Sequence, residues 1–124
     1  MPPSSGGGWK TIEDNEFLQE LTESLKWARL FSISSGQPVV FRINGVERVY
    51  GFPRPEKHIP LNTEVFSERL EKDPETGDFL ITFYPDGSMV GNDIEVVFDR
   101  TRAFRVFIHP LFGSVSLARL ESSK

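Results

Sequence analysis

The spacing of the apolar residues changes once along the chain, at Gly36. Before this glycine, apolar residues recur at every third or fourth position, which is the period of one helix face. After it, apolar and polar residues alternate in short runs, as they do in strands. We therefore expect an α+β fold: one N-terminal amphipathic helix packed on an antiparallel β-sheet of about six or seven strands.

The predicted helix covers residues 11–35. Its acidic residues come early and its basic residues late, which suits the helix dipole, and Gly36 provides a stop signal. Four residues lie partly off the main apolar stripe and leave room for contact with another protein: Trp9, Ile12, Phe17 and Leu30. We predict that the stripe serves helix packing or subunit contact through these residues: Phe17, Leu18, Leu21, Leu25, Ala28 and Phe31.

A hairpin is predicted directly after the helix. Residues 39–43 and 46–50 are rich in β-branched and aromatic residues, which favour strands. They flank Asn44-Gly45, a pair typical of the type I′ turn, because both central residues of that turn need positive φ. We therefore expect a tight structural turn at Asn44 and Gly45.

The rest of the chain predicts short antiparallel strands. Residues 51–60 contain three of the nine prolines and indicate an irregular connection. Residues 64–71 alternate imperfectly and fit either a strand or a short helix. Alternation and turn residues then predict a meander of strands at 79–84, 94–98, 103–108 and 114–120.

The length of the chain favours one domain. Its 124 residues can bury one sizeable core but not two ordinary ones. Residues 1–10 are rich in Pro, Ser and Gly and predict a flexible lead or an expression remnant. The globular domain is expected over residues 11–124, with its strands over residues 38–120.

Charge and composition exclude several function classes. Lys and Arg total 14 against 18 Asp and Glu, a net charge of -4, so the chain lacks the positive field that attracts nucleic acid or anionic lipid. It has no cysteine, which removes disulfides, thiolate nucleophiles and cysteine-bound zinc. Its histidines, His58 and His109, have no neighbouring ligands at metal-binding spacing. We therefore predict a protein that is not an enzyme and needs no metal or cofactor.

A polar stretch, FYPDGSMVGND at residues 83–93, separates two apolar runs. Its glycines lack the lysine of a phosphate-binding loop, and the Gly-x-Ser-x-Gly pattern of a nucleophile elbow is absent. Pro, Asp-Gly and Ser are the residues that β-turns use. We therefore predict a structural turn that includes Pro85, Asp86, Gly87 and Gly91.

The acidic loops leave one small-ligand hypothesis open. DPETGD, residues 73–78, resembles a calcium loop, but an EF-hand loop needs a bidentate glutamate at its twelfth position, where this chain has Tyr84. A solvated hairpin turn explains the stretch better. An enzyme or a ligand-binding protein would have to use Asp73, Glu75, Asp86 and Asp93.

Three arginines lie close together in the sequence near two aromatic residues. Arg100, Arg102 and Arg105 are interleaved with Phe104 and Phe107. Such a group can stack bases and bind phosphates of single-stranded nucleic acid. A turn and an edge strand with solvated arginines explain the same pattern.

Three stretches in order carry a resemblance to a known family. They are WARLFSISSGQPVVFRI (27–43), ITFYPDGSMVGNDIEVVF (81–98) and FRVFIHPLFGSVSL (104–117), the last with Gly113 in its turn. Together they resemble the GspH-type minor pseudopilins of type II secretion and the related FimT-like minor type IV pilins. The resemblance implies a type IV pilin-like fold, in which the N-terminal helix packs against antiparallel sheet.

The family also implies where the protein acts. Its members begin with a processed leader and an apolar half-helix, methylated at its first residue, that crosses the bacterial inner membrane once. We expect such a segment upstream of this domain, which would then lie in the periplasm.

The resemblance implies a structural role. A GspH-type subunit links the tip subunits of the pseudopilus to the major pseudopilin during export of folded proteins across the outer membrane. The expected partners are other pseudopilins, with a secreted substrate or the outer-membrane secretin as further candidates. The alternative is a FimT-like minor pilin that binds DNA in natural transformation through Arg100, Arg102 and Arg105, which the net charge of -4 disfavours.

Overall fold

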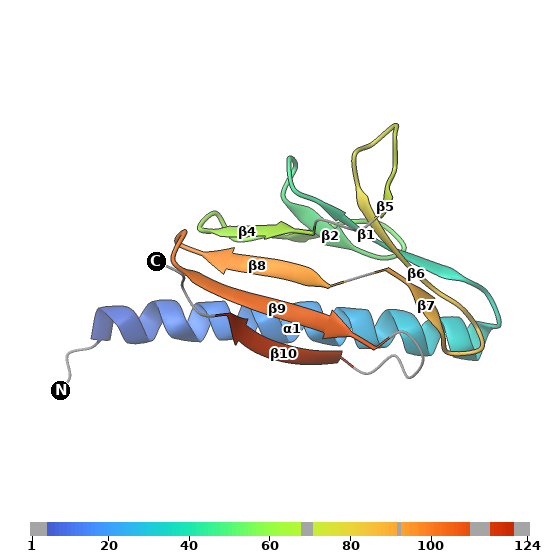
Figure 1. The fold of residues 1–124 in the computed structure, drawn as a ribbon, viewed down its shortest axis with the longest axis horizontal. Helices are drawn as coiled ribbons and strands as arrows, with labels where there is room; N and C mark the ends of the chain where they lie inside the picture. Colours follow the sequence, from blue (N-terminus) through green and yellow to red (C-terminus); the bar gives the residue numbers. More distant parts are fainter. Residues whose placement is uncertain (1–4, 68–70, 92, 110–114, 121–124) are drawn as a thin grey trace.

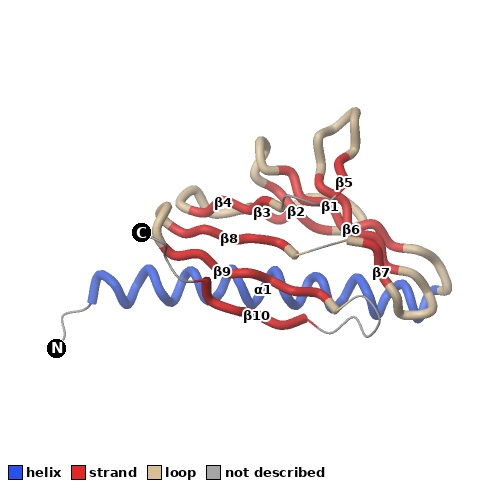
Figure 2. Tube along the Cα trace, in the orientation of Figure 1, coloured by secondary structure: helices blue, strands red, loops and turns tan. Residues whose placement is uncertain are grey.

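The computed structural model of the chain describes residues 5–67, 71–91, 93–109 and 115–120. These residues form one helix and ten strands, an α+β fold in which helix α1 (Ser5–Ser35) runs along the length of the molecule (Figures 1 and 2). Three of the strands have only two residues, which is too short for alternation to show in the sequence. The number of strands therefore exceeds the expected six or seven. The strands are β1 (Val39–Asn44), β2 (Val49–Gly51), β3 (Lys57–His58), β4 (Thr63–Phe66), β5 (Glu71–Lys72), β6 (Phe79–Phe83), β7 (Met89–Val90), β8 (Ile94–Phe98), β9 (Arg102–Ile108) and β10 (Val115–Leu120).

The described strands pair antiparallel in two sheets rather than in the expected single sheet. The first sheet has the order β3-β2-β1-β6-β5, with β7 also paired to β6, and the second has the order β10-β9-β8-β4. Strand β4 joins the second sheet because Thr63 pairs with Phe98 and Phe66 pairs with Glu95. Of the four strands predicted to form one meander, β8, β9 and β10 pair in chain order, whereas β6 lies in the first sheet between β1 and β5.

Helix α1 ends at Ser35, the predicted end, but begins earlier than predicted. Gly36 has a φ of 71°, and its N–H donates to the carbonyl of Ser32 at 3.0 Å, which closes the last turn. At the other end, the helix begins at Ser5, six residues before the predicted start at residue 11. Extending a helix costs less free energy than starting one, so the helix continues through residues of poor helix propensity.

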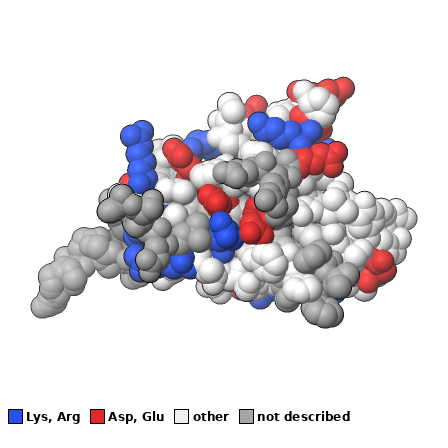
Figure 3. Space-filling view, in the orientation of Figure 1, with Lys and Arg blue, Asp and Glu red and all other residues white. Residues whose placement is uncertain are grey.

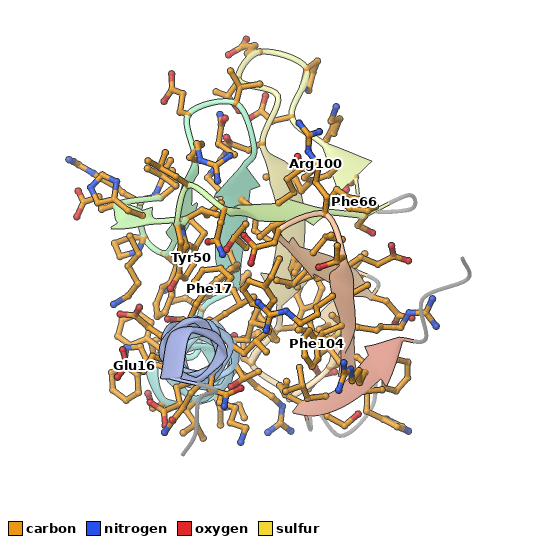
Figure 4. All side chains as sticks on the ribbon, turned by 90° about the vertical axis from the view of Figure 1, so that its left-hand side faces the viewer. Glu16, Phe17, Tyr50, Phe66, Arg100 and Phe104 are labelled. Atoms are coloured by element: carbon orange, nitrogen blue, oxygen red, sulfur yellow. The ribbon has the colours of Figure 1, made fainter. Side chains whose placement is uncertain are left out.

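The buried stripe of α1 packs against the inner faces of both sheets. Phe17 lies edge-on to Tyr50 and Phe98, with ring centroids 5.7 and 6.3 Å apart, and Figure 4 shows its side chain between the helix and Tyr50. The other buried members of the stripe are Leu18, Leu21, Leu25 and Ala28. These five residues form part of the core together with Phe41, Ile43, Ile81, Phe83, Ile94, Val96 and Val106.

Phe31 does not belong to this buried stripe. Its side chain is 45% exposed, and the next buried position after Ala28 is Ser32. Ser32 is four residues after Ala28, on the side of the helix that faces strand β6, and its hydroxyl lies 2.8 Å from the carbonyl oxygen of Gln37 and 3.1 Å from that of Phe83. A small hydroxyl residue fits here because the helix end lies close to the backbone of β6.

The first hairpin forms where predicted, but its turn is of another kind. Asn44 pairs with Val49, so the loop contains residues 45–48, and the residue with positive φ is Arg48 at 61° rather than Gly45. The side-chain oxygen of Asn44 accepts hydrogen bonds from the N–H groups of Val46 and Glu47, at 3.0 and 2.8 Å. This local bonding stabilises a longer loop in place of the type I′ turn.

Candidate interaction surface

Within the polar stretch, residues 84–88 form the turn between β6 and β7 and support the end of the helix. The backbone N–H of Gly87 donates to Tyr84, and its carbonyl accepts from Arg29 Nε at 3.0 Å. Gly87 has a φ of 92°, and a Cβ at this position would lie 2.8 Å from Arg29 Nη2. Pro85 lies beside it in the turn. The arrangement holds the turn against α1.

Asp86, Gly91 and Asp93 come from the same polar stretch, but each contacts different residues. Asp86 accepts from the N–H and the hydroxyl of Ser88, at 2.9 and 2.6 Å, and these bonds, the hydroxyl first, lower the pKa of Asp86. Asp93 lies 3.5 Å from Arg105 Nε. Gly91 follows β7, where a Cβ would lie 3.1 Å from both Ile81 and Met89. Gly113 lies outside the described residues.

The acidic loop at residues 73–78 joins β5 to β6 and is bound to an arginine of β1. Arg42 Nη1 lies 3.1 Å from Asp73 Oδ2 and 3.0 Å from Asp78 Oδ2. Asp78 also accepts from Asn44 Nδ2 at 2.8 Å. The N–H of Glu75 and, after it, the guanidinium of Arg42 lower the pKa of Asp73. The loop therefore uses its carboxylates to bind the first hairpin.

The histidines of the described part of the chain do not gather with carboxylates into a metal site. No group of three His, Asp or Glu side chains among the described residues is arranged to hold a metal ion. His58 is exposed on β3, and the ring of His109 lies 6.3 Å from that of Phe107. One open hollow, of about 300 Å³, contains carboxylates and one guanidinium in its lining: Leu61, Asn62, Glu64, Asp99 and Arg100.

The three candidate DNA-binding arginines do not form one basic patch. Arg102 lies 3.3 Å from Asp99, and Arg105 lies 3.5 Å from Glu95, so nearby carboxylates offset both charges. The β8–β9 register places Arg102 and Phe104 on the inner face and Arg105 on the outer face. Arg100 lies apart from Phe104 in Figure 4, and Figure 3 shows both charge signs interspersed on one face of the molecule.

Helix α1 presents a second stripe to solvent, opposite the buried one. Its members lie three or four residues apart, except for two adjacent residues at its end, each of which is three or four residues from the member before the pair; this places them on one helix face. All of them are exposed, and Figure 4 shows Glu16 pointing away from the sheets. We call this set the solvent stripe: Glu16, Glu20, Glu23, Trp27, Leu30 and Phe31.

The solvent stripe has an acidic half followed by an apolar half. Trp27 is 58% exposed and Leu30 is 53% exposed. The ring of Phe31 lies 6.5 Å from Trp27 and 5.9 Å from Phe52, which joins the apolar half to the segment after β2. In the acidic half, Glu20 lies 3.3 Å from Lys57. The apolar half is therefore an exposed group of large hydrophobic side chains on α1.

Comparison with family models, with characterised proteins and with solved structures gives no match for this chain. Within the described residues, no helix combines the length and the apolar character needed to cross a membrane.

The side chains of Trp9 and Ile12, expected beside the helix stripe, lie outside the described side chains. A signal for the solvent stripe was present in the sequence, since Trp27, Leu30 and Phe31 share one face with Glu16 and Glu23.

Proposed function

We propose that this chain is a pilin-like assembly subunit, a minor pseudopilin of the GspH type, that acts through protein–protein contact. The observation that carries this proposal is the apolar half of the solvent stripe, where Trp27, Leu30 and Phe31 face away from the core. Exposed apolar residues grouped on one helix face favour contact with another protein. One long helix on antiparallel sheets is also the architecture that the family resemblance implies.

In this proposal the domain lies in the periplasm and links tip subunits to the major pseudopilin. An apolar segment before the domain anchors it in the inner membrane. The direction of α1 supports this arrangement, because its first turns extend past the ends of the strands (Figure 1). A helical extension would therefore leave the domain without crossing either sheet.

The test is complementation of a gene deletion in the bacterium that carries the gene. We expect deletion to stop the release of secreted proteins, and the unaltered gene to restore it. A double variant, Trp27→Glu with Leu30→Glu, should fail to restore release, because it places charge on the apolar half of the solvent stripe. Immunoblots should show normal levels of the variant.

Val46→Glu is the matched control for this experiment. Val46 is also apolar and 92% exposed, but it lies in the β1–β2 loop, away from α1. It should restore release fully. The proposal is wrong if release continues after the deletion, or if the double variant restores release as well as Val46→Glu does.

A further inference from the structure

The two sheets have four outer margins, and three of them offer few unpaired backbone N–H and C=O groups to a further strand. In the first sheet, one margin is β3 and the other is formed by β5 and β7, each only two residues long. In the second sheet, the margin of β4 lies against the β1–β2 loop. Short or covered edge strands are the usual protection against pairing with another chain.

Arg48 and Gly45 are the residues that cover the margin of β4. The guanidinium of Arg48 donates to the carbonyl of Thr63, the first residue of β4, and to that of Pro60. A Cβ on Gly45 would lie 3.7 Å from the carbonyl oxygen of Val65. Carbonyl groups along β4 are therefore in contact with the loop instead of open to a further strand.

The fourth margin, that of β10, is neither short nor paired with a further described strand, although α1 contacts this strand. Strand β10 pairs with β9 through six consecutive residue pairs, from Val115 with Ile108 to Leu120 with Ala103. On its other side, no described strand pairs with it. It contains no proline, no lysine and no break in register, and residues 116–119 are exposed. An edge of this length is a template for a further strand.

The side chains on β10 indicate what such a strand should carry. Leu117 pairs with the buried Val106 and Arg119 pairs with Phe104, so both side chains are on the inner face, two positions apart. Leu117 is 47% exposed, and Arg119 makes no ion pair with any described residue. A strand placed beside β10 would bring its own side chains next to both.

We propose that the margin of β10 binds an extended segment of another protein as a fifth strand of the second sheet. The segment carries an aliphatic residue beside Leu117 and, two positions along, an aspartate or glutamate beside Arg119. Backbone hydrogen bonds give the affinity, and these two side chains give the selectivity. The site is separate from the solvent stripe of α1, so this inference does not rest on the proposed function.

Charge favours another protein over a second copy of this chain. If two copies paired across a two-fold axis with Leu117 opposite Leu117, Arg119 would lie opposite Val115 and gain no carboxylate. Strand β10 has no acidic residue, so the carboxylate beside Arg119 has to come from an acidic segment of a different chain.

The probe for the test is the fluorescein-labelled peptide Thr-Val-Thr-Glu-Thr-Val-Thr. Its valines and its glutamate share one face, and its symmetry allows either strand direction. We expect fluorescence anisotropy to show saturable binding to the whole chain, and amide exchange measured by NMR to slow at residues 115–120. A peptide with lysine in place of glutamate should bind about fivefold more weakly, as expected for the loss of one exposed ion pair.

Two variants and a control make the test specific. Arg119→Glu should reverse the preference, so that the lysine peptide binds better than the glutamate peptide, whereas Arg119→Lys should keep the original preference. Arg54→Glu makes the same charge change at an exposed arginine outside the second sheet and should leave both affinities unchanged. Because position 119 is exposed, the melting temperatures should match that of the unaltered chain.

Several results would overturn the proposal. One is no binding at millimolar peptide, and another is slowed exchange that lies outside residues 115–120. A third is equal binding of the two peptides by the unaltered chain, which does not depend on any variant. The fourth is a dimer in sedimentation experiments that Leu117→Lys converts to a monomer, since this assigns the margin to a second copy.

Discussion

Replacing Arg42 with methionine should reveal which of its two carboxylate partners matters more to the fold. Distance does not separate them, because Arg42 Nη1 lies 3.1 Å from Asp73 and 3.0 Å from Asp78. The two carboxylates differ in exposure, because the Asp78 side chain is 6% exposed and that of Asp73 is 21% exposed. Water can replace the guanidinium at Asp73 far more easily than at Asp78.

The expected loss of unfolding free energy follows from this difference. After Arg42→Met, Asp78 keeps only its bond from Asn44, and a buried carboxylate that loses a charged partner costs about 1–3 kcal/mol. We expect about 2 kcal/mol for Arg42→Met. Both carboxylates raise the pKa of Arg42, Asp73 first and Asp78 second. We nevertheless expect the larger coupling with Asp78, because solvent screens the interaction with Asp73.

The assay is a pair of double-mutant cycles measured by urea unfolding. One cycle combines Arg42→Met with Asp78→Asn, and the other combines it with Asp73→Asn. The coupling free energy should be about 1–2 kcal/mol for Asp78 and clearly smaller for Asp73. Added salt should reduce the Asp73 coupling more. A coupling with Asp73 that equals or exceeds that with Asp78 would refute the argument from exposure.

Two further predictions test the helix and the β6–β7 turn. Leu25→Ala should lower the unfolding free energy by about 3–4 kcal/mol, because Leu25 is fully buried, whereas Leu30→Ala on the exposed face should change it by less than about 0.5 kcal/mol in the same urea assay. Ser88→Ala should raise the lowered pKa of Asp86 toward its ordinary value of about 3.9, measured by carboxyl ¹³C NMR. A lowered carboxyl pKa stabilises the fold above the ordinary pKa, and this contribution is lost as the pH falls through the folded value, so Ser88→Ala should weaken the pH dependence in acid.

The positions of the longer strands could be predicted because burial alternates along them. Ile81 and Phe83 are buried in β6 as the period of two requires, and the sequence predicted the bounds of β8 correctly. The division into two sheets could not be predicted, because it depends on pairing Thr63 with Phe98, far along the chain. Local patterns carry no information about such partners.

The turn and helix errors have local physical causes. Asn44-Gly45 favours a type I′ turn in isolation, but the Asn44 side chain bonds to the N–H groups of the longer loop. Phe31 fits the helical period as well as Ser32 does, and the close approach of β6 decides that the smaller residue is buried. Both outcomes depend on contacts that a sequence period does not include.

The arginine pattern looks basic along the chain, but the sheet places carboxylates beside two of its three arginines. Arg105 pairs in register with Glu95, and Arg102 lies near Asp99 at the turn. Had the β8–β9 register been known, the opposite charges would have been visible from the sequence alone. The solvent stripe needed no such knowledge, since its members lie on a single helix.

The two opposite stripes of α1 set different rates of evolutionary change along one helix. Substitutions at Leu25 or Ala28 must preserve the fold and should be rare among descendants of this chain. Substitutions at the exposed Trp27 or Leu30 should leave the free energy of folding nearly unchanged, so under the proposed function they are free to follow a changing partner. A lineage could therefore acquire a new binding specificity on this helix without any compensating change in the core.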